Sequence, residues 1–289
     1  MKIEDVTIIG AGPAGIATAI QLKRYGLEPL LLEKGHIGGL LVNANLVENY
    51  PGFPQGISGM DLVNLFKAQL ERAGVTVNFE EVLQLDYDDF FTIETPQRKL
   101  YSRIVVIASG TQPREFDFPS EVSDRVFYEV YPIASVEGER IAIIGAGDAA
   151  FDYALNLSRK NEIAILNRGE KRRCLPLLWE RTKSSPQITY HEKAEISGIE
   201  KAGNEIILQC NTPNGKQKFQ ANYVIFAIGR TAQLDYLSAR LRERTSKLEE
   251  QGLLCLVGDV KNDIYRQTSI AVGDGVHAAM KICAKIEEA

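Results

Sequence analysis

The sequence predicts an α/β protein made of two Rossmann-like nucleotide-binding domains, each a three-layer ββα arrangement with a small antiparallel meander. A β-branched run, Val6–Ile9, leads into the glycine pattern G-x-G-x-x-G at Gly10, Gly12 and Gly15. The pattern returns as G-x-G-x-x-A at 145–150, again between an apolar strand and a helical stretch. Two copies of one dinucleotide-binding plan in one chain predict two bound dinucleotides.

Each part of the first copy has a physical role. Gly10 permits a tight turn, Gly12 lets a pyrophosphate approach the backbone, and Gly15 lets helix and strand pack closely. The helical pattern from Ile16 to Tyr25 then offers its N-terminus to the phosphates. Glu33 ends the next strand, where an acid accepts hydrogen bonds from ribose hydroxyls. A purely structural glycine turn is the alternative, and the register of all these parts disfavours it.

Composition limits the classes of function. The chain has 289 residues, 45% of them hydrophobic and 25% charged, which is typical of a globular protein with a substantial core. Its net charge is −5 and its longest basic tract is Lys171–Arg173, so we expect no nucleic-acid partner. No apolar run approaches the roughly 20 residues that span a bilayer. The first strand begins too early for a signal peptide, so the sequence predicts a cytoplasmic protein without a membrane anchor.

Cysteine spacing excludes a local redox pair. No C-x-x-C occurs, so neither a zinc ribbon nor a local dithiol can form, and no metal site is expected. Each cysteine is expected to be a small apolar residue. A reactive Cys174, its pKa lowered by Arg172 and Arg173, is a less favoured alternative. The four cysteines are Cys174, Cys210, Cys255 and Cys283.

The remaining elements follow from hydrophobic periodicity and turn signals. Ser58 is a candidate N-cap for a helix over 59–73. In the first half, strands are expected at 75–79, 82–86, 90–94 and 99–102, with an apolar run at 104–108. The second half predicts strands at 162–166, 195–200, 205–209, 217–220 and 223–228. The last segment predicts a helix over 235–250, a strand over 252–257 and a helix over 269–287.

The two copies differ where nucleotide specificity is set. The second strand end carries Asn167 instead of an acid, and Arg168, Arg172 and Arg173 follow it. An acid would repel a 2′-phosphate, whereas arginine stabilises one. The second site is therefore expected to prefer NADPH, with NADH left open. A solvated basic loop is the alternative interpretation of the arginines.

Five segments resemble the low-molecular-weight thioredoxin reductases, of the class II pyridine nucleotide-disulfide oxidoreductases. They read GAGPAG at 10–15, EKGHIGG at 33–39, VENYPGFP at 47–54, GAGDAA at 145–150 and GDVKNDIYRQTS at 258–269. The resemblance implies an FAD-binding domain of residues 1–112 and 233–289. An NAD(P)H-binding domain, 113–232, would be inserted into it. It also implies a homodimer.

The resemblance also implies which residues bind the cofactors. Asp259 would bind the ribityl chain, and a helix start at Arg266–Thr268 would face the flavin pyrimidine ring, where reduced flavin is negatively charged. The FAD set is Gly10, Gly12, Pro13, Ala14, Gly15, Glu33, Lys34, Gly38, Gly39, Leu40, Asn49, Val82, Ala108, Ser109, Gly110, Gly258, Asp259, Arg266, Gln267 and Thr268. The NADP set is Gly145, Gly147, Asp148, Ala149, Arg168, Arg172, Arg173, Ile228 and Gly229.

The sequence departs from that family at its redox centre. Counted without gaps from Gly145, the family's C-x-x-C position is Tyr128-Glu129-Val130-Tyr131, and Pro132 replaces the family's acid. The chain is therefore not expected to be a working thioredoxin reductase. Tyr128 and Tyr131 could lie near the isoalloxazine, or could be packing or surface residues.

The predicted function is an FAD-dependent NAD(P)H oxidoreductase that passes electrons to an external acceptor, with no catalytic side chain of its own. Thioredoxin-reductase-like ferredoxin–NADP reductases also lack the C-x-x-C, so ferredoxin and flavodoxin are candidate acceptors. That group carries a longer C-terminal extension than this chain shows, and small quinones, dyes and oxygen stay open. A low-turnover flavin- and nucleotide-binding redox sensor is the alternative from another class.

Overall fold

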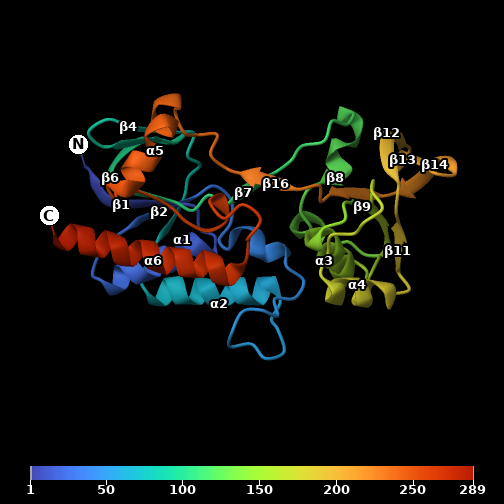
Figure 1. The fold of residues 1–289 in the computed structure, drawn as a ribbon, viewed down its shortest axis with the longest axis horizontal. Coiled ribbons are helices and arrows are strands. Elements are labelled where there is room, and N and C mark those ends of the chain that lie inside the picture. Colours follow the sequence, from blue (N-terminus) through green and yellow to red (C-terminus); the bar gives the residue numbers. More distant parts are fainter. Residues whose placement is uncertain (1, 289) are drawn as a thin grey trace. The chain divides into compact units, whose positions relative to one another are not determined.

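The computed structural model describes residues 2–288, which form two compact units (Figure 1). Unit 1 contains the residues up to 42, then 47–112, and those from 231 onward. Unit 2 contains 113–230 together with the short segment 43–46. The resemblance to thioredoxin reductases implies boundaries at 112/113 and 232/233. The contacts instead group 231–232 with unit 1 and 43–46 with unit 2, a grouping that no local pattern indicates.

Unit 1 is built on a mixed sheet of order β3-β2-β1-β6-β5-β4, with β17 also paired to β6. Parallel strands surround β1, and the meander β4-β5-β6 is antiparallel. The runs expected at 99–102 and 104–108 form one strand, β6, whose first half pairs with β5 and second half with β17. The strands are β1 (Glu4–Ile9), β2 (Leu30–Glu33), β3 (Val77–Phe79), β4 (Gln84–Tyr87), β5 (Phe91–Glu94), β6 (Lys99–Ile107) and β17 (Leu254–Leu256).

Helices cover both faces of this sheet. Figure 1 shows α1 (Pro13–Arg24), α2 (Gly59–Arg72) and α6 (Thr268–Glu287) along one face, with α5 (Ala239–Glu250) on the other. α1 begins at Pro13, three residues before the expected Ile16, because proline suits the first position of a helix. The hydroxyl of Ser58 accepts a hydrogen bond from the N–H of Asp61, so the expected N-cap of α2 is confirmed.

Unit 2 repeats the plan with a parallel sheet of order β11-β10-β9-β15-β8. The strands are β8 (Val126–Phe127), β9 (Arg140–Ile144), β10 (Glu162–Leu166), β11 (Ile188–His191) and β15 (Tyr223–Phe226). An antiparallel meander follows, of β12 (Glu195–Ala202), β13 (Glu205–Thr212) and β14 (Gly215–Ala221). The helices are α3 (Asp148–Leu157) and α4 (Pro176–Lys183). The sequence analysis missed α4 and β11, because eight and four residues are too few for periodicity to identify.

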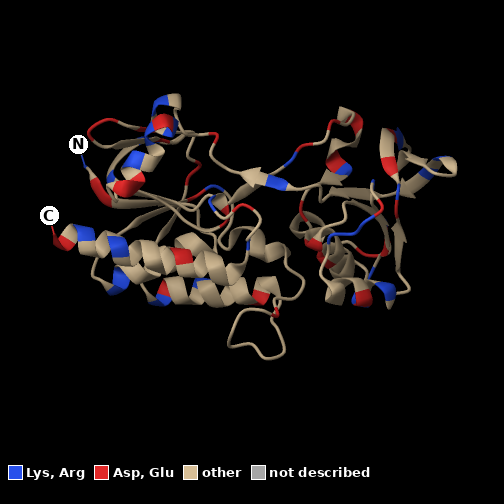
Figure 2. Cartoon of the chain, viewed as in Figure 1, with Lys and Arg blue, Asp and Glu red and all other residues tan. Residues whose placement is uncertain are grey.

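The segments between the units pair with each other. β7 (Thr111–Pro113) leaves unit 1, and β16 (Arg230–Ala232) returns to it, as a two-stranded sheet. Within residues 2–288 there are also four short 3-10 helices; those used below are η1 (Gly39–Asn43) and η4 (Gly258–Val260). Lys and Arg alternate with Asp and Glu over both units (Figure 2). Within residues 2–288, no helix has both the length and the apolarity that crossing a membrane requires.

Asp152, on α3, is a half-buried acid in unit 2. Burial raises the pKa of Asp152 to about 6, and the charge of Asp148 adds to that rise. The backbone N–H of Asn45 donates to its Oδ2 at 2.8 Å, and this hydrogen bond and the charge of Arg159 oppose the rise. The folded protein therefore holds a proton on Asp152 at pH values where the unfolded chain has lost it.

This raised pKa predicts how stability varies with pH. Between about pH 4 and 6 the folded state binds more protons, so the favourable contribution is present below pH 4 and lost as pH rises through 6. Asp152→Asn keeps an acceptor for Asn45 but removes the titration. In urea titrations, the difference in unfolding free energy between Asp152→Asn and the wild type should shift by about 2 kcal/mol in favour of the variant as the pH rises from 4.5 to 7.5. Asp117→Asn, at an exposed carboxylate of the same unit, should show no such change; equal pH profiles for wild type and Asp152→Asn would contradict the assignment.

Candidate functional site: two dinucleotide-binding turns

Two glycine turns lie at the carboxyl ends of the central parallel strands, one in each unit. Gly10 follows β1 with φ +105°, and a Cβ there would lie 2.4 Å from the carbonyl oxygen of Ala108. Gly145 follows β9 with φ +150°, and its Cβ would lie 2.4 Å from the carbonyl oxygen of Ala227. Both glycines are therefore required by the protein's own backbone. Gly15 is required as well, since its Cβ would lie 1.9 Å from the carbonyl oxygen of Gly10.

The second glycine of each turn is not required by the protein. Gly12 has φ −76° and Gly147 has φ −94°, which any residue adopts. A Cβ at either position would have no heavy atom of the protein within 4 Å. Each glycine also precedes a helix, α1 or α3, whose first N–H groups favour an anion. The open space beside Gly12 and Gly147 therefore fits the pyrophosphate of a dinucleotide.

The residues that end the second strands differ in what they can still bind. Glu33 accepts the N–H of Ala11 on Oε2 at 2.7 Å and the N–H of Gly35 on Oε1 at 2.8 Å. A carboxylate has about four acceptor positions, so Glu33 keeps capacity for ribose hydroxyls. It lies at the turn where the first copy of the motif predicts an adenosine ribose.

Asn167 takes the equivalent place in unit 2. Its Oδ1 accepts the N–H of Gly169, two residues later, at 3.0 Å, just as Glu33 accepts the N–H of Gly35. Its Nδ2 donates to the hydroxyl of Tyr190 at 2.9 Å. With only 5% of its surface exposed, Asn167 shapes the loop that follows it. Asn167, unlike Glu33, brings no negative charge that would repel a 2′-phosphate.

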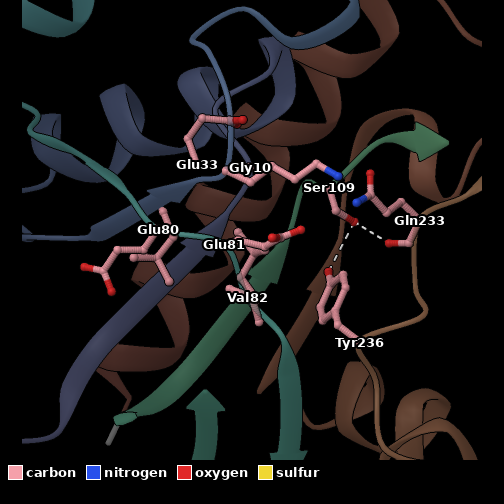
Figure 3. A pocket seen from close by; sticks show the side chains of 11 residues that line it. Gly10, Glu33, Glu80, Glu81, Val82, Ser109, Gln233 and Tyr236 are labelled. Carbon is pink, nitrogen blue, oxygen red and sulfur yellow. Dashed lines mark hydrogen bonds between the residues drawn. The ribbon is translucent and has the colours of Figure 1, made fainter. Parts of the chain in front are cut away.

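A pocket opens beside the first turn (Figure 3). Its lining includes five residues of the predicted FAD set: Gly10, Glu33, Lys34, Val82 and Ser109. The sequence analysis missed the other lining residues Ile9, Leu32, Glu80, Glu81, Gln233 and Tyr236. Glu80 and Glu81 directly precede Val82, and that adjacency was the available signal. Gln233 and Tyr236 belong to the segment that returns from unit 2, and no local pattern links them to the turn.

One wall of this pocket is a chain of hydrogen bonds (Figure 3). The hydroxyl of Tyr236 donates to Ser109 Oγ at 3.2 Å, and Ser109 Oγ donates to the carbonyl of Gln233 at 2.7 Å. The N–H of Gln233 donates to the carbonyl of Gly110 at 3.1 Å. Burial raises the pKa of Tyr236, so its hydroxyl remains a donor. These bonds fix the predicted FAD residues Ser109 and Gly110 against the returning chain.

A second part of unit 1 forms at the start of α6. Asn49 Nδ2 donates to Gln267 Oε1 at 2.8 Å, which joins two residues of the predicted FAD set from distant segments. α6 begins at Thr268, so Arg266 and Gln267 lie at its N-terminus as expected. Arg266 Nε is buried without a hydrogen-bond partner among residues 2–288. An unsatisfied donor beside a helix N-terminus fits an anionic or acceptor group of a ligand.

The packing of the protein itself explains why a glycine is needed at position 38 of the predicted FAD set. Gly38 donates its N–H to the carbonyl of Ala11 at 2.8 Å, and a Cβ there would lie 2.5 Å from Val63 Cγ2. The neighbouring Gly39 opens η1, and its Cβ would lie 3.4 Å from Gly12 Cα. Gly39 thus lies near the open space, whereas position 38 must be a glycine because a side chain there would collide with Val63.

In unit 2, Arg173 takes the place that Gly38 has in unit 1. Its N–H donates to the carbonyl of Ala146 at 2.6 Å, which holds residue 173 beside the second turn. The guanidinium of Arg172 instead lies over the Trp179 ring, 4.4 Å from its centroid. Within residues 2–288, the guanidinium groups of Arg168 and Arg173 form no hydrogen bond or ion pair, so both can bind a phosphate.

The other predicted NADP residues border the same turn. Asp148 Oδ1 accepts the N–H of Leu175 at 2.7 Å, which ties the start of α3 to the start of α4. Ala149 follows in the first turn of α3. Ile228 and Gly229 follow β15, and Gly229 has φ +112° and accepts the N–H of Arg114 at 3.0 Å.

The structure contradicts the idea of an activated thiol at Cys174. Burial raises the pKa of Cys174, and Asp148 raises it further, against a smaller lowering by Arg172. Burial also raises the pKa of Cys210 and of Cys255 to about 11, and that of Cys283 is raised. All four thiols therefore remain protonated near neutral pH. No group of three or more metal-ligating side chains occurs within residues 2–288.

The segment at the family's C-x-x-C position is held inside unit 2 by ordinary packing. The hydroxyl of Tyr128 accepts the N–H of Phe116 at 2.9 Å, and its ring lies 6.0 Å from that of Phe226. Glu129 pairs with Arg230 at 3.2 Å. Tyr131 is 43% exposed. Tyr128 thus serves the core of unit 2, and a place for either tyrosine near a flavin stays a prediction.

Comparison with known proteins identifies the family. The pyridine nucleotide-disulphide oxidoreductase family matches residues 4–276. The chain belongs to this family. It is 30% identical to the thioredoxin reductase of Streptomyces coelicolor, over 96% of this chain and 92% of the relative. It is 29% identical to the NADPH-dependent thioredoxin reductase 3 of Arabidopsis thaliana, over 96% of this chain but 57% of that longer protein.

Solved structures show the same fold. The thioredoxin reductase of Lactococcus lactis has a TM-score of 0.85 and 26% identity, with 99% of this chain and 100% of that chain covered. That of T. acidophilum has a TM-score of 0.86 and 25% identity, with the same coverage. The chain is therefore a flavin-dependent NAD(P)H oxidoreductase of this family, whose cofactors are FAD and NADPH. The open space beside Gly12 and Gly147 fits the pyrophosphate that both dinucleotides contain.

The glycine geometry gives a discriminating prediction. Gly12→Ala should leave the melting temperature of the apoprotein nearly unchanged, because a Cβ there meets no protein atom. It should weaken FAD binding at least roughly tenfold, since the methyl group takes the space of the pyrophosphate. Gly10→Ala is the matched control: its Cβ meets a backbone carbonyl at positive φ, so we expect a much lower melting temperature. If Gly12→Ala bound FAD as tightly as the wild type does, the space beside Gly12 would not be the pyrophosphate site.

The arginines give a second prediction. Arg173→Ala should raise KM for NADPH roughly tenfold and leave KM for NADH within about twofold, because it removes a charge-assisted bond to the 2′-phosphate. Arg172→Ala, the neighbouring control, should change the ratio of the two KM values by less than about threefold, since Arg172 lies on Trp179. Equal effects of the two variants on that ratio would contradict the prediction that Arg173, and not Arg172, binds the 2′-phosphate.

Proposed function

We propose that this protein passes electrons from NADPH through FAD to an external acceptor, without an internal dithiol. The supporting observation is a pair of complete dinucleotide turns in a chain whose cysteines form no C-x-x-C and are held as protonated thiols. Unit 1, with its acid at Glu33, would bind FAD, and unit 2, with Arg168 and Arg173, would bind NADPH. The boundaries of these two binding domains are part of the proposal.

When bound, the two cofactors supply the hydride transfer itself. The chain's residues would bind and orient them. Gly12 and Gly147 would admit the pyrophosphates, and Glu33 would bind the adenosine ribose. The start of α6 at Arg266–Thr268 would place N–H groups, among them the buried Nε–H of Arg266, where reduced flavin carries negative charge. No side-chain nucleophile or general base is required for this chemistry.

The region that would carry a dithiol supports the second half of the proposal. Neither Tyr128 nor Glu129 can act as a dithiol. Tyr128 bonds to Phe116, and Glu129 bonds to Arg230 and Asn43. The relatives are thioredoxin reductases, and for that reaction this chain would need another electron carrier. An acceptor that takes electrons directly from flavin needs none.

Among external acceptors, ferredoxin and flavodoxin are the proteins that a flavin reductase without a dithiol would serve. Small quinones and oxygen are the low-molecular-weight candidates. A low-turnover redox sensor is the alternative in which the flavin is bound but hardly reduced. A homodimer and a cytoplasmic location are also part of the proposal, and both derive from the resemblance to thioredoxin reductases.

Anaerobic stopped-flow spectroscopy tests the proposal. Mixing the holoprotein with NADPH should bleach the flavin absorbance in a phase faster than turnover, and NADH should do so more slowly. Ferredoxin, flavodoxin, a quinone and oxygen are then mixed separately with the reduced protein to see which restores the absorbance. An absence of bleaching with either nucleotide would favour the sensor. Stoichiometric reduction of a thioredoxin disulfide would contradict the proposed path.

A further inference from the structure

Both backbone polar groups of Gly258, in unit 1, are held by two side chains. The N–H of Gly258 donates to Asp274 Oδ2 at 3.1 Å. Asn262 Nδ2 donates to that same oxygen at 2.6 Å and to the carbonyl of Gly258 at 3.0 Å. Asp274 lies on α6, and Asn262 lies in the loop between η4 and α6. The result is a closed ring of hydrogen bonds around one glycine.

Close packing fixes the same residue from the other side. Gly258 has φ +74°, and a Cβ there would lie 2.8 Å from Ala14 Cβ in the first turn of α1 and 3.5 Å from Ala271 Cβ on α6. Gly275, next to Asp274, is equally close to α1, since its Cβ would lie 2.2 Å from the carbonyl oxygen of Ala14. Gly258 is thus wedged between the starts of α1 and α6.

These contacts bear directly on cofactor geometry. α1 and α6 both begin at residues of the FAD set, and Asp259, the residue next to Gly258, is the one expected at the ribityl chain. The orientation of the 258–259 peptide decides where the Asp259 side chain points. Holding Gly258 by its N–H and its C=O fixes that orientation before the cofactor arrives, so less ordering is needed on binding.

We propose that Asp274 is a positioning residue for FAD, which acts through Asn262 and Gly258 on Asp259. Asp274 itself does not touch the cofactor. Its carboxylate accepts two hydrogen bonds, and such charge-assisted bonds are about twice as strong as neutral ones. The inference rests on FAD as the ligand of unit 1.

Asp274→Asn tests this inference with little change in volume. The neutral amide oxygen can still accept from the Gly258 N–H and from the Asn262 amide, but both bonds lose the carboxylate's charge, so the ring holds Gly258 less firmly. We expect the Kd for FAD, titrated into apoprotein, to rise on the order of tenfold. The visible circular dichroism of the bound flavin should also change, because the ribityl chain is held differently. Glu287→Gln, which removes the same charge from the far end of α6, is the control and should change neither quantity.

Asn262→Ala provides the second route. Because Asn262 and Asp274 act in one ring, the double variant should bind FAD about as weakly as the weaker single variant. If Asp274→Asn fails to fold, Asn262→Ala alone carries the test through the same two measurements. Unchanged Kd and circular dichroism in the folded variants would overturn the inference, even if only their melting temperatures fall. Wild-type protein that binds no FAD would instead overturn the proposed function.

Discussion

The backbone of each glycine turn lies so close to the end of a neighbouring parallel strand that no side chain fits between them. Gly10 against Ala108 and Gly145 against Ala227 show the same separation, although the two turns belong to different units. This contact places the start of the following helix directly above the sheet's carboxyl edge. The open space at Gly12 and Gly147 depends on it, because a looser turn would let other side chains fill that volume. The binding capacity of both units therefore begins with one steric constraint.

The two units share this constraint but differ at the end of the second strand. Glu33 retains acceptor capacity at one strand end. At the other, the side-chain amide of Asn167 is hydrogen-bonded to Gly169 and Tyr190. In each unit a backbone N–H donates to the carbonyl of the residue that follows the first glycine of the turn. The donor is Gly38 in unit 1 and Arg173 in unit 2. A repeated scaffold thus places a carboxylate beside one pyrophosphate site and a cation beside the other. In the proposed function, these local differences at equivalent positions are what would direct FAD to unit 1 and NADPH to unit 2.

The sequence alone predicts the parts that depend on local chemistry. The two glycine turns, their flanking strands and the start of α6 follow from short patterns with a steric or dipolar cause. The short elements α4 and β11 do not, because too few residues carry their periodicity. Gln233 and Tyr236 in the pocket wall, and the ring through Asp274, join segments far apart in the chain, and no spacing rule links them. The pKa of Cys174 also required the structure, since its burial and Asp148 outweigh the nearby arginines.

In the proposed function, FAD is the only redox centre between NADPH and the acceptor. An anaerobic reductive titration of the holoprotein with dithionite, followed by visible absorbance, measures this directly. A flavin without a dithiol should reach full reduction after about two electrons per bound FAD. Uptake of about four electrons per FAD would reveal a second two-electron centre and contradict the claim.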